Sequence, residues 1–211
     1  MSINANNIET ILIYFAKNKE LFLNEAQFQF ELALEIKKQF PSLVVHLEYP
    51  SLKGNSNGQY SYYDIVIQEG NEFYVIELKY KTKDQVVLYK GSNYLLKNHA
   101  AQDLGRFDYL NDVSRIENWQ SNNQGKIFVG GCAIILTNDS SYWAKDGNNC
   151  IYKNFALKDK TKIPSGQKNW PTVTKTTSVG KSRIKGLNLK KSYQIDWKNY
   201  CDSFKYLMLN I

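Results

Sequence analysis

The sequence has few of the residues that build disulfide frameworks or zinc sites. Its 211 residues include three cysteines and two histidines. Because Cys132, Cys150 and Cys201 are odd in number, widely spaced and without a CxxC pair, they support neither a disulfide framework nor a Cys/His zinc site. We expect reduced thiols, as in a cytoplasmic protein.

Long hydrophobic runs are also lacking. No apolar stretch approaches the roughly 20 residues that a membrane helix requires. The first ten residues, MSINANNIET, lack the basic-then-apolar order of a signal peptide, so we expect a cytoplasmic protein without membrane contact. Aromatic residues, in contrast, make up 14% of the chain, and they predict a folded core because they supply the buried area that offsets chain entropy.

The formal charge of +7 is concentrated in one segment. Residues 157–191 hold ten basic residues against one acid, whereas the rest of the chain holds 17 basic residues against 19 acids. A local field of this size attracts polyanions, and nucleic acid is the commonest of these in the cytoplasm. A solvated loop that only keeps the protein soluble is the alternative. The predicted nucleic-acid contacts are Lys181, Arg183 and Lys185 in this segment, and Arg106 upstream of it.

Apolar spacing predicts two helices at the start of the chain. Apolar side chains recur at helical intervals in residues 6–18 and again in residues 25–40. Asn24 can cap the second helix through its side-chain oxygen. Glu25 lies in the first turn of that helix on the apolar-facing stripe, which is an unusual position for a charge and singles it out as a candidate functional residue.

The next part of the chain predicts strands. Residues 43–50 are rich in β-branched side chains and favour a strand. Residues 62–67 and 72–80 are apolar and aromatic runs that flank Gly70 and Asn71, a pair of residues that favours a two-residue hairpin turn. The segment that follows this hairpin is read as a lysine-rich loop.

The remaining sequence predicts a helix, a strand and a closing helix. The helix falls in residues 98–119, the strand in residues 126–139 and the closing helix in residues 192–211. The order helix, strand, hairpin, helix, strand predicts an α/β sandwich with a mixed sheet. We expect a core over residues 1–150 and a basic C-terminal extension over residues 151–211 that packs on it.

The hairpin register brings two carboxylates together. With a Gly70-Asn71 turn, Asp64 lies directly opposite Glu77, so both side chains share one face with Cβ atoms about 4.5–5.5 Å apart. Lys79 points to the same face because it lies two residues beyond Glu77. Carboxylates in strands as apolar as these need a charged partner.

A magnesium ion is the partner that this set of residues suits best. Asp and Glu are hard oxygen ligands that hold Mg²⁺ and leave positions open for water and phosphate, and a lysine beside the ion can orient the attacking water. A cation also removes the repulsion between two close carboxylates. Glu25 is the preferred third carboxylate, with Glu31 and Glu35 as its competitors in the same helix.

The order of these residues resembles a known family. Glu25, then Asp64 with the apolar run 65–67, then Glu77-Leu78-Lys79 resembles the PD-(D/E)XK nuclease superfamily, which includes many restriction endonucleases and archaeal Holliday-junction resolvases. The resemblance covers about residues 24–137, and Tyr63 stands where the motif has proline. It implies a restriction-endonuclease-like α/β/α sandwich around a central mixed sheet.

The resemblance also implies roles for individual residues. It implies that Mg²⁺, with Mn²⁺ as an option, is held by the side chains of Glu25, Asp64 and Glu77 and by the carbonyl of Leu78. Lys79 would assist the nucleophilic water. Gln102 matches the glutamine that some branches carry on the helix after the hairpin, where it approaches the metal or the DNA backbone.

Three functions are carried forward from the sequence. The first is an Mg²⁺-dependent endodeoxyribonuclease that hydrolyses phosphodiester bonds, and a homodimer is an option because nucleases that cut both strands often act as dimers. The second is a nucleic-acid-binding or accessory protein that keeps the nuclease fold without cutting. The third is an interaction protein whose basic segment meets an acidic partner, which salt-sensitive DNA affinity would separate from the other two.

Overall fold

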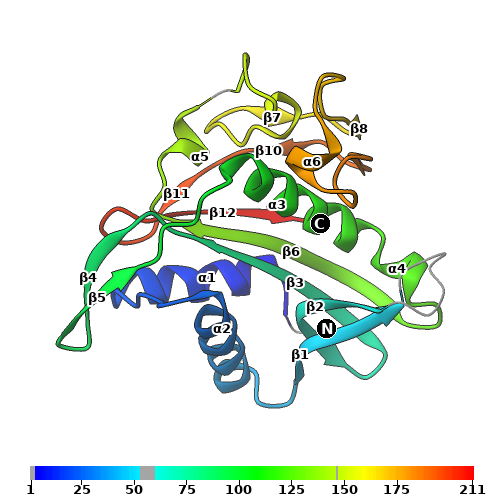
Figure 1. The fold of residues 1–211 in the computed structure, drawn as a ribbon. Helices are drawn as coiled ribbons and strands as arrows, with labels where there is room; N and C mark the ends of the chain where they lie inside the picture. The colour runs from blue at the N-terminus through cyan, green and yellow to red at the C-terminus, as the bar shows by residue number, and fades with distance from the viewer. Residues whose placement is uncertain (1–2, 53–59, 146) are drawn as a thin grey trace.

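A mixed six-stranded sheet forms the centre of the computed structural model, which describes residues 3–52, 60–145 and 147–211 (Figure 1). β3 and β6 run parallel, and every other neighbouring pair in the sheet is antiparallel. The sheet order is β1 (Val44–Leu52), β2 (Tyr60–Glu69), β3 (Glu72–Lys81), β6 (Ile127–Thr137), β12 (Lys205–Asn210) and β11 (Lys198–Asn199). Of the helices in the described ranges, none has the length and apolar character needed to cross a membrane.

The central hairpin has the predicted register. Ile65 pairs with Ile76 and Glu69 pairs with Glu72, which is the pairing that a two-residue Gly70-Asn71 turn imposes. Gly70 adopts a φ of +60°, which glycine allows at no steric cost. The β2–β3 ladder ends at the Ile65–Ile76 pair, one position before Asp64 and Glu77.

Two N-terminal helices cover one face of the sheet, as predicted (Figure 1). They are α1 (Ala5–Lys17) and α2 (Glu25–Gln39). The side chain of Asn24 caps α2 by accepting a hydrogen bond from the backbone N–H of Gln27 at 2.8 Å. The apolar stripe of α2 includes Phe28 and Leu32, and it packs against the even-numbered β3 side chains, such as Ile76.

A long helix covers the opposite face of the sheet. This helix, α3 (Gln102–Glu117), packs through Leu110 and Val113 against Val75 of β3 and Ile135 of β6, and the short α4 (Trp119–Asn122) follows it. The polypeptide after β6 wraps over this helix (Figure 1). Its small elements are α5 (Ser141–Ala144), η1 (Lys153–Phe155), β7 (Lys162–Ile163), β8 (Gly166–Lys168), α6 (Thr176–Val179), β9 (Leu187–Leu189) and β10 (Tyr193–Gln194).

The prediction of a lysine-rich loop after the central hairpin is wrong. This segment forms a second hairpin of β4 (Gln85–Tyr89) and β5 (Ser92–Leu96), which lies apart from the central sheet. Lys90 and Gly91 both adopt positive φ at its turn. The strands were missed because only Val87 and Leu96 are buried, so the segment shows no alternation of buried and exposed residues over a useful length.

The predicted closing helix is also wrong, because the chain ends in strands. β12 pairs antiparallel with β6 and is buried on both sides, with Tyr206 in the α1–α2 core and Leu207 in the α3 core. A strand buried on both faces gives a continuous apolar run, which periodicity does not separate from a helix. Residues 151–211 therefore pack over α3 and also contribute β11 and β12 to the same sheet as the rest of the protein.

Candidate functional site

Two carboxylates bind the edge of β3 at the point where the β2–β3 ladder ends. The Asp64 Oδ2 atom accepts a hydrogen bond from the Leu78 backbone N–H at 2.6 Å. The Glu25 Oε2 atom, from the first turn of α2, accepts one from the Tyr80 backbone N–H at 2.7 Å. These side chains satisfy N–H groups that another strand would otherwise bind. The local end of the strand pairing thus places Asp64 and Glu25 along one edge.

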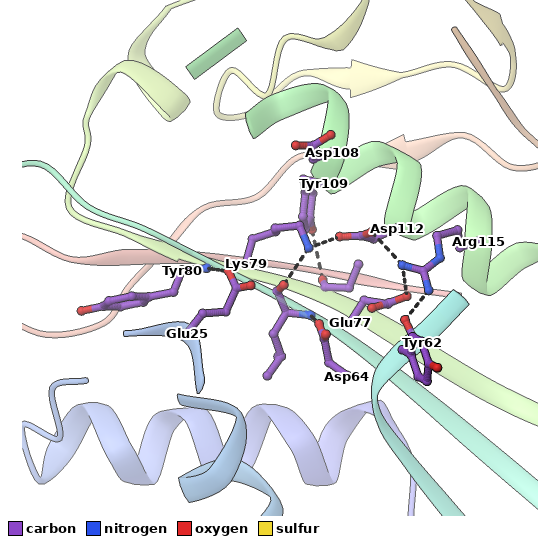
Figure 2. A network of polar contacts seen from close by, with 12 residues as sticks. Glu25, Tyr62, Asp64, Glu77, Lys79, Tyr80, Asp108, Tyr109, Asp112 and Arg115 are labelled. Atoms are coloured by element: carbon purple, nitrogen blue, oxygen red, sulfur yellow. Dashed lines mark hydrogen bonds and ion pairs between the residues drawn. The ribbon is translucent and has the colours of Figure 1, made fainter. Parts of the chain in front are cut away.

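The next two charged residues of the motif lie on the α3 face of β3, because strand side chains alternate. The Lys79 ammonium lies 2.6 Å from Asp112 Oδ2 and donates a hydrogen bond to the Leu78 carbonyl at 3.0 Å. Glu77 Oε1 lies 3.0 Å from the Arg115 Nη1 atom. Figure 2 shows these side chains converging between β3 and α3, with Glu25 and Asp64 beside them.

Asp112 and Arg115 are site residues that were not predicted from the sequence. Arg115 Nη1 lies 3.5 Å from Asp112 Oδ1, its Nη2 donates to the Tyr62 carbonyl, and its guanidinium stacks on the Tyr63 ring. A signal was present in the sequence. Asp112 lies three residues after the buried Tyr109, so a carboxylate occupies the apolar stripe of α3 just as Glu25 does in α2.

Carboxyl groups outnumber cations in this cluster, with Glu25, Asp64, Glu77 and Asp112 against Lys79 and Arg115. Burial, followed by repulsion from Asp112, raises the pKa of Glu77 well above its usual range. Burial likewise raises the pKa of Asp112 to about 6, against the opposing effect of Lys79. Burial is also the main cause of the raised pKa of Asp64, with Glu25 adding repulsion. The carboxylates therefore lack sufficient counter-charge from the protein.

Lys79 carries a firm positive charge. Burial alone would lower the pKa of its ammonium, but the carboxylates of Asp112, Glu25 and Asp64 outweigh burial and raise it. At neutral pH Lys79 is therefore a hydrogen-bond donor and not a proton acceptor. Its ion pair with Asp112, which is buried in α3, fixes where the ammonium lies.

The side chains of the cluster supply only part of the ligand set that a hard divalent cation takes. Within residues 3–52, 60–145 and 147–211, no three His, Cys, Asp or Glu side chains form a group that could hold a metal ion. Mg²⁺ commonly takes one or two carboxylates and completes its shell with water and substrate phosphate. Asp64, Glu77 and the Leu78 carbonyl supply oxygen atoms of this kind, and the uncompensated negative charge described above favours a cation there.

Two predicted site residues lie elsewhere. The Gln102 side chain donates to Asp139 Oδ2 at 3.1 Å, at the end of β6, and it contacts none of the four motif residues. Arg106 is fully buried, with its guanidinium carbon 4.6 Å from the Tyr142 ring and 4.2 Å from the Tyr152 ring. The prediction that Arg106 contacts nucleic acid at the surface is therefore wrong, because the segment after β6 covers it.

The basic segment borders α3 near the cluster. Lys181 and Lys185 are exposed. Arg183 forms a two-point ion pair with Asp108 of α3, with contacts of 2.7 and 2.9 Å. This pair holds residues 181–185 along the helix that also carries Asp112 and Arg115.

No protein family, curated protein or solved structure matched this chain when it was compared with each. The mixed α/β architecture is thus observed in the structure itself. The family resemblance rests on the motif residues and on the geometry of the cluster that they form.

Proposed function

We propose that this protein is a metal-dependent nuclease with a restriction-endonuclease-like fold that hydrolyses phosphodiester bonds in DNA. One observation carries the proposal: Glu25, Asp64, Glu77 and Lys79, distant in sequence, converge where β2 separates from β3. The cluster holds four carboxylates against two cations, and burial raises the pKa of Glu77 well above its usual range. Such an arrangement is costly for stability, which is typical of a functional site.

Asp64, Glu77 and the Leu78 carbonyl would hold Mg²⁺ or Mn²⁺, with Glu25 as a further acidic neighbour. When bound, such an ion polarises a phosphoryl oxygen and lowers the pKa of a bound water. The divalent charge would also offset the repulsion between carboxylates, which adds to the effect of burial in raising the pKa of Asp64 and Glu77.

The protein side chains around these ligands have separate roles in the proposal. The protonated Lys79 donates a hydrogen bond that orients the attacking water or steadies the charge on the phosphate. Asp112 positions Lys79 through the 2.6 Å ion pair. Arg115 holds Glu77 in place through the 3.0 Å contact.

Cleavage of DNA with and without metal tests the proposal. Supercoiled plasmid, linear duplex and single-stranded DNA would be incubated with the purified protein in Mg²⁺, in Mn²⁺ and in EDTA. We expect cleavage of at least one substrate in metal and none in EDTA, because the buried carboxylates bind the ion that activates water. Cleavage that continues undiminished in EDTA would contradict the metal-dependent site.

The exposed lysines of the basic segment should bind the phosphate backbone. Replacing Lys181 and Lys185 by Ala should weaken DNA binding and reduce the slope of log affinity against log salt by about two, since each phosphate contact contributes about one. The matched control replaces Lys17 and Lys38, which are exposed on α1 and α2, on the other side of the sheet. Equal effects of the two pairs would place the DNA-binding surface elsewhere.

A non-cutting, DNA-binding protein on the same fold is the second candidate. One observation favours it: Lys79 pairs with Asp112, and Glu77 with Arg115, using only protein charges. Salt-sensitive DNA binding without cleavage of any substrate in either metal would support this candidate over the nuclease.

A further inference from the structure

A cleft of about 450 Å³ lies along α3 next to the carboxylate cluster. β2 and α4 form one side of it, and residues 182–183 of the basic segment form the other. The residues that line it are Ser61, Tyr63, Phe107, Asp108, Asn111, Arg115, Asn122, Ser182 and Arg183. A volume of this size lies within the range typical of small-ligand pockets.

The polar lining of the cleft suits the edge of a nucleobase. Tyr63 and Phe107 lie at the base of the cleft, but they are only 1% and 3% exposed, so neither ring offers an open face for stacking. Asn111 and Asn122 add carboxamides, and a carboxamide both donates and accepts hydrogen bonds, as the edge of a nucleobase does. The Asn111 side chain has no hydrogen-bond partner in the part of the chain that the structure describes, so its amide is available to a ligand.

Two arginines give the cleft an anion-binding character. Asp108 holds Arg183 by two contacts of 2.7 and 2.9 Å, so the guanidinium is fixed before a ligand arrives. Arg115 is fixed by Glu77, Asp112 and the Tyr62 carbonyl. The lining therefore carries two positive charges and one negative charge, and it faces neighbouring exposed lysines at 181 and 185.

Arg115 belongs to both the cleft and the cluster, since its Nη1 atom lies 3.0 Å from Glu77. A polynucleotide whose phosphate lay at the cluster would have its adjoining nucleotide beside Arg115. We propose that the cleft binds one unpaired nucleotide of the substrate, with the edge of its base at the Asn111 amide and its phosphate at the arginines. This inference rests on the proposed function. It assigns to the proposed nuclease a preference for substrates with unpaired or extruded nucleotides.

Nucleotide binding without metal tests the cleft independently of cleavage. The four deoxynucleoside 5′-monophosphates would be titrated in EDTA into the wild type and into Ser182→Trp, which places an indole at the rim of the cleft. The control is Ser178→Trp, an exposed position on α6 that does not line the cleft. We expect saturable binding of at least one nucleotide, a loss of about tenfold or more in Ser182→Trp, and no change in the control.

Asn111→Ala provides a second variant that leaves the cleft open. It should lower the affinity for the nucleotide that binds best more than the affinity for the other three, because an amide distinguishes the edges of the bases. The absence of saturable binding by the wild type, or equal binding by the wild type and Ser182→Trp, would overturn the proposal.

The same variants separate this inference from the proposed function. Metal-dependent cleavage with no nucleotide binding would leave the nuclease standing and remove the cleft. Nucleotide binding that Ser182→Trp abolishes, with no cleavage under any condition, would support the cleft and remove the nuclease. If both stand, a duplex with one unpaired nucleotide should be cut faster than a fully paired one, and Ser182→Trp should lose that preference.

Discussion

Asp64→Asn and Glu77→Gln should each lower metal-dependent DNA cleavage by at least about 1,000-fold. An amide keeps the size of the carboxylate but removes the negative charge that would hold the proposed divalent cation, and such an ion contributes several kcal/mol to the stability of the transition state. The measurement is the single-turnover rate on the substrate that the wild type cleaves. The residual rate should not recover at high Mg²⁺, because the ligand itself is missing.

The same substitutions should leave the protein folded, and Glu77→Gln should be as stable as the wild type or more stable at alkaline pH. Burial raises the pKa of Glu77 in the folded protein above the unfolded value of about 4.3. The folded state therefore holds this proton more tightly than the unfolded state, and the wild type loses stability as the pH rises through that range. A neutral amide does not titrate, so the advantage of the variant should be small near pH 4 and larger near pH 8.

Thermal unfolding at those two pH values, in EDTA, measures this difference. A Glu77→Gln variant that is much less stable at both pH values would indicate an ion pair with Arg115 that serves the fold alone.

The helix carboxylate has its own matched control. Glu25→Gln should lower cleavage and Glu31→Gln should not, because Glu25 bonds the β3 edge from the first turn of α2 whereas Glu31 lies six residues further along that helix. Equal rates for the two variants would exclude Glu25 from the site.

Lys79→Ala should lower the cleavage rate by about 100- to 1,000-fold while metal affinity changes little. The loss reflects the removal of a fixed charged donor from the site where charge develops. Its ammonium is placed by Asp112 at 2.6 Å, so Asp112→Asn should lower the turnover rate with a smaller effect than Lys79→Ala. Metal affinity is read from the rise in unfolding temperature with added Mn²⁺, which reports binding to the folded state.

Lys81→Ala is the matched control for Lys79→Ala. Both lysines lie on β3 two residues apart and share a face of the strand, but it is Lys79 that pairs with Asp112 of the carboxylate cluster. We expect near wild-type cleavage from Lys81→Ala. A Lys79→Ala variant with a large loss of metal affinity and unchanged turnover would show that Lys79 holds the site together and does not act on the substrate.

The local sequence pattern was sufficient to predict the parts of the fold that depend on residues close together in the sequence. The Gly70-Asn71 turn determines the register of β2 and β3 by local backbone geometry, and so brings Asp64 and Glu77 to the end of the ladder, one position beyond its last pair. The cap at Asn24 and the stripe of Phe28 and Leu32 determine α2 in the same way.

Long-range packing decided the rest. β12 was mistaken for a helix because its partner, β6, lies about seventy residues away, and only pairing with it reveals a strand buried on both faces. The β4–β5 hairpin was missed because its apolar side chains are largely exposed.

The candidate site divides in the same way. The sequence by itself determined four of its residues, Glu25, Asp64, Glu77 and Lys79, because a charge in an apolar stripe or strand is visible wherever the element goes. Only the tertiary structure shows that Asp112 and Arg115 contact these residues, and that Gln102 and Arg106 lie elsewhere. Which charges meet depends on how α3 crosses β3 and on what covers its far side. Those are packing outcomes of the whole chain, and no local spacing encodes them.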